Sequence, residues 1–133
     1  MGAWGAGTFQ NDDAADWLYE FTEAGNEAVL RTGLEATEIG EGYLEAPRAS
    51  RILGACEIVA ALRGRPAPDL PEEARNWVEQ HAELDVSSLV PVAIGGIDRI
   101  LAENSELNEL WSENQAEYPA WRGSLLDLRS RLE

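Results

Sequence analysis

The chain has 133 residues and a formal net charge of −15, with 25 Asp and Glu residues against 10 basic ones. A surface this acidic repels nucleic-acid phosphates and anionic lipids, which argues against direct binding to DNA, RNA or a membrane surface. The hydrophobic content of 44% is too high for a disordered chain, and the length suits one domain covering residues 1–133.

Several compositional features indicate a bacterial, cytoplasmic protein. All ten basic residues are Arg, which is typical of a GC-rich genome, although adaptation to high salt could give the same acidic, Lys-free chain. The single Cys56 cannot form an internal disulfide. No segment has the roughly 18 consecutive apolar residues of a membrane span, and the N-terminus lacks the pattern of a signal peptide.

Residues 1–11 form a glycine-rich arm that is unsuited to a helix and too irregular for a strand. We expect Trp4 and Phe9 to anchor this arm across the helical domain. Glycine N–H groups ahead of a helix can also cradle a phosphate. That alternative is disfavoured because no strand precedes the glycines, no Lys follows them, and three aspartates occupy the helix start.

The first two helices are expected on either side of Gly25. The first begins at residues 11–13, where Asn and Asp side chains can cap exposed N–H groups and complement the helix dipole. Its apolar face has the spacing i, i+3, i+4, i+7 and consists of Ala14, Trp17, Leu18 and Phe21. The second helix covers about residues 26–39, with a weaker period because Gly33 interrupts it.

The third helix is the candidate central element of the fold. Pro47 suits its first turn, Gly64 suits its end, and apolar residues surround it on most sides. Residues 63–73 then form a short Pro-rich connector. A fourth helix follows from residue 71 to His81, with Asp69 as a possible cap.

The remaining chain predicts two or three further helices. One begins near residues 87–88 and tolerates Pro91 in its first turn. Its apolar phase continues through Trp111, so it either runs to about residue 115 or is interrupted where Ser105 caps a new helix. Pro119 starts the last helix, whose heptad-like spacing places Trp121, Leu125, Leu128 and Leu132 on one face. The prediction is an all-α single-domain bundle of five to seven helices.

Two groups of carboxylates are candidates for chemistry. Asp12 and Asp16 lie one helical turn apart and could share a divalent cation, but a second aspartate-rich motif is missing, and capping explains both residues more simply. Glu57 stands alone on the most apolar helix, where a carboxylate must find a partner or take up a proton. A raised pKa would suit a general acid. A buried ion pair with Arg48, Arg51 or Arg63, or a merely exposed side chain between small residues, is the favoured interpretation.

The other reactive residue types do not form a catalytic set. His81 is the only histidine, and its place at the end of a polar helix suits a C-terminal cap. Cys56 has no neighbouring histidine in sequence and reads as a small core residue. One Cys and one His cannot supply the usual zinc ligands, so no catalytic residue, metal or cofactor is predicted.

The distinctive stretches are MGAWGAGTFQNDDAADW at the start, ACEIVAALRGRPAP at residues 55–68 and NSELNELW at 104–111, followed by Trp121 and Leu132. On these stretches nearly the whole chain resembles the bacterial domain-of-unknown-function family 4259. The resemblance implies a small bacterial protein with no established activity. Glu57 matches a glutamate in the family's alanine-rich helix, and Cys56 stands where alanine is usual. The family's opening is matched by Trp4, Gly5, Gly7, Phe9, Asn11, Asp12 and Trp17.

Two functional hypotheses follow. The leading one is a non-enzymatic binding or interaction protein, an immunity-like or regulatory partner that presents an acidic surface to a basic protein. The alternative is a small-ligand or metal-dependent enzyme whose carboxylate site joins the arm, the acidic helix start and Glu57. Its weak candidates for ligand contacts are Trp4, Asp12, Asp16 and Glu57.

Overall fold

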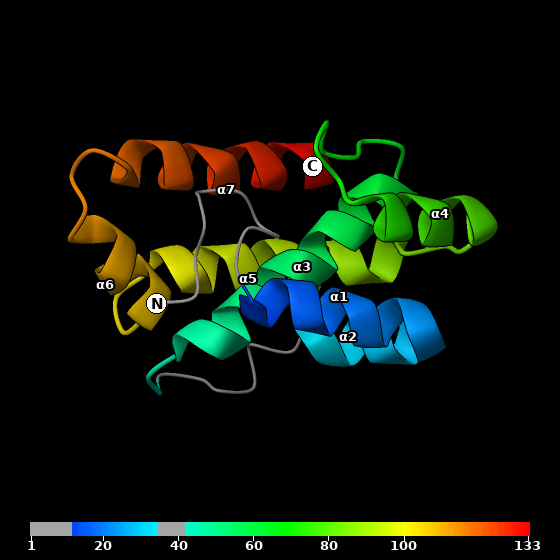
Figure 1. Cartoon of the computed structure of the whole chain (residues 1–133), viewed down its shortest axis with the longest axis horizontal. Helices are drawn as coiled ribbons and strands as arrows, with labels where there is room; N and C mark the ends of the chain where they lie inside the picture. Colours follow the sequence, from blue (N-terminus) through cyan, green and yellow to red (C-terminus); the bar gives the residue numbers. More distant parts are fainter. Residues whose placement is uncertain (1–11, 35–41) are drawn as a thin grey trace.

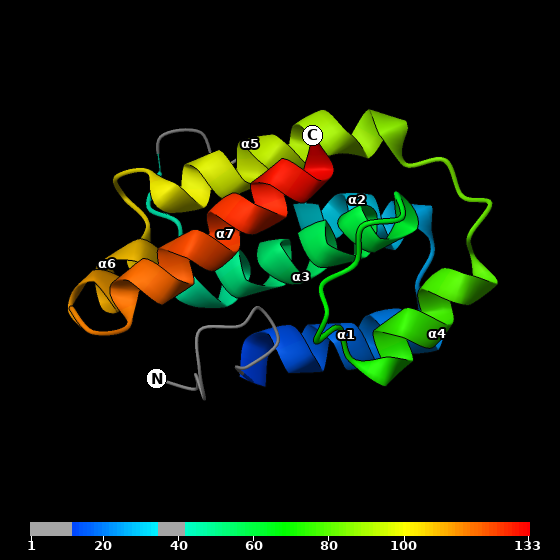
Figure 2. The same ribbon diagram turned by 90° about the horizontal axis from the view of Figure 1, so that it is seen from above.

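The fold is organised around one buried helix, α3 (Ala46–Leu62), which contacts each of the six other α-helices of the described chain. The computed structural model describes residues 12–34 and 42–133. Figure 2 shows α1 and α4 on one side of α3, with α5 and α7 on the other. The helices around α3 are α1 (Asp12–Ala24), α2 (Glu27–Leu34), α4 (Glu72–Gln80), α5 (Val90–Leu101), α6 (Glu106–Ser112) and α7 (Tyr118–Leu132).

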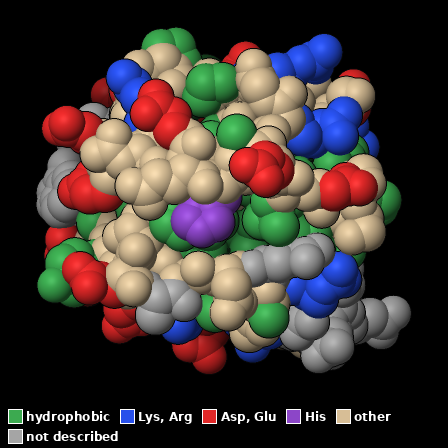
Figure 3. Space-filling model, turned by 90° about the vertical axis from the view of Figure 1, so that its right-hand side faces the viewer, with side chains coloured by type: hydrophobic (Ala, Val, Ile, Leu, Met, Phe, Trp, Pro, Cys, Tyr) green, Lys and Arg blue, Asp and Glu red, His purple; other side chains and the backbone are tan. Residues whose placement is uncertain are grey.

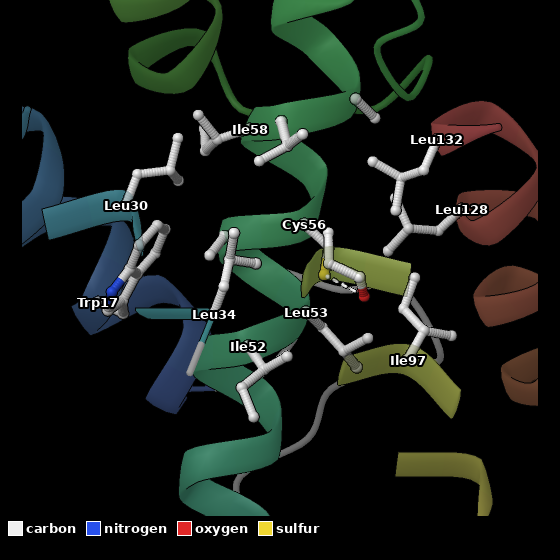
Figure 4. Close-up of a cluster of buried hydrophobic side chains, with 14 of the residues drawn as sticks. Trp17, Leu30, Leu34, Ile52, Leu53, Cys56, Ile58, Ile97, Leu128 and Leu132 are labelled. Carbon is white, nitrogen blue, oxygen red and sulfur yellow. Dashed lines mark hydrogen bonds between the residues drawn. The ribbon is translucent and has the colours of Figure 1, made fainter. Parts of the chain in front are cut away.

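The composition of α3 explains its central position. Every residue from Ile52 to Ala61 is buried, including the small residues Gly54, Ala55 and Cys56. Small side chains let neighbouring helices approach closely, and the larger Ile and Leu side chains fill the space that remains. Figure 4 shows this core, in which side chains of α1, α2, α5 and α7 surround α3. The sequence-based expectation of a central third helix is confirmed, with bounds shifted by one or two residues.

Both ends of α3 follow the expected signals. Pro47 lies in the first turn, where its missing N–H is not needed. At the other end Gly64 adopts a φ of 86°, a left-handed conformation that glycine adopts without strain. The N–H of Gly64 donates to Ala61 O at 3.0 Å and the N–H of Arg65 donates to Ala60 O at 3.0 Å. This double hydrogen bond is a Schellman motif, and it stops the helix at Leu62.

Helices α5 and α6 are separate. Of the two alternatives from the sequence, the structure therefore confirms the one in which Ser105 caps a new helix. The Ser105 hydroxyl accepts a hydrogen bond from the Asn108 N–H at 3.4 Å and caps α6. Just before it, Asn104 has a positive φ of 61°. The N–H of Leu44 donates to Asn104 O at 2.8 Å, and the N–H of Glu106 donates to Leu44 O at 2.9 Å. This short parallel bridge ties the start of α6 to the segment that leads into α3.

The structure confirms the all-α fold and corrects one capping prediction. Helix α4 begins after Pro71 without a side-chain cap, so the prediction of Asp69 as its cap is wrong. The fixed φ of Pro71 starts this helix instead. The arm at residues 1–11, with Trp4, and the end of the predicted 26–39 helix lie outside the described residues. No helix in the described ranges is both long and apolar enough to cross a bilayer.

Candidate functional site

Helix α1 has two opposite faces, one apolar and one acidic. The apolar face carries Ala14, Trp17, Leu18 and Phe21, all buried against the core. The opposite face exposes five carboxylates, which come from Asp12, Asp13, Asp16, Glu20 and Glu23. Tyr19 lies among them with 67% of its surface exposed. A large exposed aromatic among charges is a common feature of contact surfaces.

Helix α4 lies against α1 and extends the acidic surface. Its exposed carboxylates are Glu72, Glu73 and Glu79. Aromatic rings join the two helices: Phe21 stacks on Trp17 with centroids 4.9 Å apart, and it meets Trp77 of α4 in a tilted contact with centroids 4.5 Å apart. We call the eight exposed carboxylates of α1 and α4, together with Tyr19, the acidic face. Their helices are also adjacent in the ribbon (Figure 1).

The acidic face is not neutralised within the described part of the molecule. The four ion pairs found there involve Arg129 and Arg131 of α7, and none includes a carboxylate of the acidic face. The single basic residue on α1 and α4 is Arg75, whose guanidinium donates to the carbonyl oxygens of Pro68 and Leu70. Like charges on one helix and on its neighbour repel, and a cationic partner would relieve the repulsion.

Glu57 forms the buried ion pair that the sequence analysis favoured, but with a different partner. Arg131 NH1 donates to Glu57 Oε1 at 2.9 Å and to Arg65 O at 3.2 Å, while Arg131 Nε donates to Asp127 Oδ2 at 2.9 Å. Burial alone lowers the pKa of Arg131, but the hydrogen bonds and charges of Glu57 and Asp127 outweigh it and leave the pKa raised. The pair therefore joins α3 to α7 as a structural contact.

The ion pair found for Glu57 is with Arg131, and helical spacing disfavours the arginines that the sequence analysis named as partners. Arg51 and Arg63 are six residues from Glu57 and Arg48 is nine, whereas residues on one helix face are three or four apart. Arg48 and Arg51 therefore lie on other faces of α3, and Arg63 follows its last residue, Leu62. The long side chain of Arg131 reaches Glu57 from α7, which packs along the face that Glu57 occupies.

The carboxylates of the enzyme hypothesis occupy different environments. Asp12 and Asp16 are exposed on α1, whereas Glu57 is 6% exposed and bound to Arg131. Trp4 is outside the described residues. Within residues 12–34 and 42–133, no group of three or more His, Cys, Asp or Glu side chains is placed to hold a metal ion. Asp12 and Asp16 therefore do not share one environment with Glu57.

Cys56 and His81 have the structural roles expected of them. Cys56 is fully buried, its Sγ donates to Ala93 O at 3.5 Å, and burial raises the pKa of the thiol, so a nucleophilic thiolate is disfavoured. The His81 ring stacks on Trp77 with centroids 3.9 Å apart. Its Nδ1–H donates to Trp77 O at 2.8 Å at the end of α4. Figure 3 shows His81 at the surface, with Asp and Glu side chains to either side.

Sequence reasoning missed part of the acidic face although the signal was present. Asp12, Asp16, Glu20 and Glu23 follow one another at helical spacing, so the acidic stripe continues well past the capping positions. The sequence also indicates that Tyr19 is exposed, because it is one helical turn from Asp16 and from Glu23.

These features define a small acidic all-helical protein with a charged face and no converging catalytic set among its described residues. The chain belongs to DUF4259, a family described as a domain of unknown function, whose model matches residues 2–124. The match includes all of α1 through α6 and the first turns of α7. No curated protein and no solved structure matches the chain.

Proposed function

We propose that this chain is a bacterial, cytoplasmic, non-enzymatic interaction protein that binds a basic protein through the acidic face of α1 and α4. The observation that carries the proposal is the set of eight exposed carboxylates with no ion-pair partner among the described residues. A complementary basic surface would be steered to this face over a distance of about 8–10 Å at physiological salt. The proposed role of this chain is therefore that of an immunity-like or regulatory protein, which presents its acidic face to a basic protein.

Tyr19 distinguishes the acidic face from a surface that serves solubility alone. Solvated charged faces need no large aromatic side chain, yet Tyr19 is 67% exposed at the edge of the α1 stripe, one helical turn from Asp16 and Glu23. Tyrosine contributes contact area at a low cost in conformational entropy and is enriched at energetically important interface positions. We therefore propose that Tyr19 is part of the interface, beside the carboxylates of α1.

The test compares two triple variants with equal changes in net charge. One carries Asp16→Asn, Glu20→Gln and Glu23→Gln on the acidic face. The control carries Glu103→Gln, Glu113→Gln and Glu117→Gln, which are also exposed and form no ion pair with a described residue. Each immobilised protein is incubated with lysate of the native bacterium, and a protein retained by the wild type is then purified and titrated directly.

The proposal expects a basic protein that the wild type and the control retain and the acidic-face variant loses, with an affinity that falls as salt rises. Tyr19→Ala should weaken the same complex by at least 1 kcal/mol in binding free energy, about the threshold for an important contact. Equal retention by both triple variants would refute the acidic face as the interface. Failure to retain any basic protein would refute the proposal as a whole.

A further inference from the structure

A cavity of about 500 Å³ is lined by Trp17, which belongs to the buried face of α1 and not to the acidic face. Its walls come from Trp17 of α1, from Val29 and Gly33 of α2, and from Arg48 and Arg51 of α3. The volume is within the usual range for small-molecule pockets. None of its described lining residues is acidic, although the chain as a whole has a net charge of −15.

Trp17 brings an unused hydrogen-bond donor to this cavity. The residue is 8% exposed, and its indole N–H donates to no other group in the described structure. In Figure 4 the indole nitrogen of Trp17 is turned away from the side chains of α3. No buried side-chain nitrogen or oxygen of the described residues lacks a hydrogen-bond partner, so the unpaired indole nitrogen is accessible to a bound acceptor.

Gly33 keeps the approach to this N–H open. A Cβ placed on Gly33 would lie 3.3 Å from Nε1 of Trp17 and 3.3 Å from the Cβ of Ala55. Any larger side chain at this position would therefore crowd the indole nitrogen. The absence of a side chain at position 33 leaves room for an acceptor atom beside Trp17 at the cavity wall.

Arg51 supplies positive charge at the cavity rim. Its Nε donates to Pro47 O at 3.2 Å, and its two terminal nitrogens bond no residue in the described ranges. Arg48 lies one turn earlier and lines the same cavity. Both arginines also line an adjoining cavity of about 360 Å³, which contains Glu45. An anion is therefore better accommodated on the Trp17 side.

We propose that the cavity between α1, α2 and α3 binds a small amphipathic carboxylate. Arg51 pairs with the carboxylate, and the Trp17 N–H donates to one of its oxygens. The apolar part of the ligand packs against Val29, Ala28 and the indole ring. The combination of charge, one neutral donor and apolar walls favours an organic acid over an inorganic oxyanion. This binding site does not depend on the proposed acidic interface.

The test uses phenylacetate as the probe and nuclear magnetic resonance as the readout. The chain has five tryptophans, so the ¹⁵N spectrum contains five indole N–H signals, and Trp17→Phe identifies the signal of Trp17. We expect saturable movement of the Trp17 signal with phenylacetate while the Trp111 and Trp121 signals stay in place. Phenylacetamide has the same shape without the charge and should bind at least tenfold more weakly, because a charge-assisted bond is lost.

Matched variants keep the test decisive. Arg51→Gln should weaken phenylacetate binding about tenfold or more, whereas Arg63→Gln, an exposed arginine at the other end of α3, should leave it unchanged. The acidic-face triple variant should bind phenylacetate like the wild type. The proposal is overturned if no saturable shift occurs, if the amide binds equally well, or if Arg51→Gln and Arg63→Gln behave alike. Equal binding of inorganic phosphate would overturn the assignment to an organic acid.

Discussion

Glu57 of α3 and Arg131 of α7 are 74 residues apart in sequence, yet Arg131 NH1 lies 2.9 Å from Glu57 Oε1. Their side chains are only 7% and 16% exposed. The pair links α7 to the central helix beside their hydrophobic contacts. It occupies the site where the sequence placed a possible general acid, and it makes Glu57 a structural residue.

The first prediction is that Arg131→Met lowers the free energy of unfolding by about 3 kcal/mol, because Glu57 is left buried without its guanidinium. Urea denaturation measures the change. The control is Arg129→Met, which breaks an ion pair to Asp98 whose two side chains are 33% and 53% exposed. This variant should change stability far less, because water screens and solvates an exposed pair. Equal losses in the two variants would contradict the structural role of Glu57.

The second prediction contrasts two glycines. A Cβ on Gly25 would lie 2.1 Å from the backbone oxygen of Phe21 and 2.6 Å from its ring, so Gly25→Ala must displace the buried Phe21. We expect a loss of about 1–3 kcal/mol or more in the free energy of unfolding. Gly123 is exposed inside α7 with nothing within 4 Å of the added atom. Gly123→Ala should therefore stabilise the protein by about 0.5–1 kcal/mol. Thermal unfolding of both variants checks the opposite signs.

The sequence was informative where local chemistry decides the structure. Pro47 and Gly64 marked the ends of α3. The ring of Pro47 restricts φ to a helical value in the first turn, and Gly64 can adopt the positive φ that follows the last turn. The run of apolar residues from Ile52 onward marked the same helix as central, since apolar residues surround it on most sides. These signals involve neighbours within one or two helical turns.

The sequence was uninformative where distant segments meet. Leu44 pairs with Ser105 through backbone atoms. Every residue type except proline has the same backbone groups, so the sequence does not indicate this pairing. The choice of Arg131 as the partner of Glu57 depends on how α7 crosses α3, which helical periodicity does not determine. For the same reason the cavity at Trp17 could not be foreseen, because its walls come from three helices.

The third prediction concerns the cap that separates α5 from α6. Ser105 is 1% exposed, and its hydroxyl accepts the N–H of Asn108. Ser105→Ala should reduce the free energy of unfolding by about 1 kcal/mol, because a helical N–H loses its acceptor. Ser112 at the other end of α6 is exposed and donates only to Glu109 O, so Ser112→Ala should have a much smaller effect. Chemical denaturation of the two variants measures both losses. A similar loss in Ser112→Ala would show that replacing any serine of α6 destabilises the protein, and that the cap has no special role.

The fourth prediction uses the titration of Tyr43. Its hydroxyl donates to Glu109 Oε2 at 2.7 Å, and this hydrogen bond, with smaller contributions from burial and nearby carboxylates, raises the pKa of Tyr43 from 10.0 to about 12. Glu109→Gln removes the charge and should bring the pKa back toward 10.0. Ultraviolet absorbance of the tyrosinate, compared with Tyr43→Phe, isolates this one transition.

The sign of the stability effect follows from the direction of the shift. Because the folded pKa of Tyr43 lies above the ordinary value of 10.0, the neutral phenol is favoured by folding. The contribution of the Tyr43–Glu109 contact is therefore fully present below about pH 10 and is lost as the pH rises through about 12. Wild type and Glu109→Gln should accordingly differ in stability near neutral pH and converge in strong alkali. A difference that grows between pH 10 and 12 would show that Glu109 does not hold Tyr43 in its protonated form.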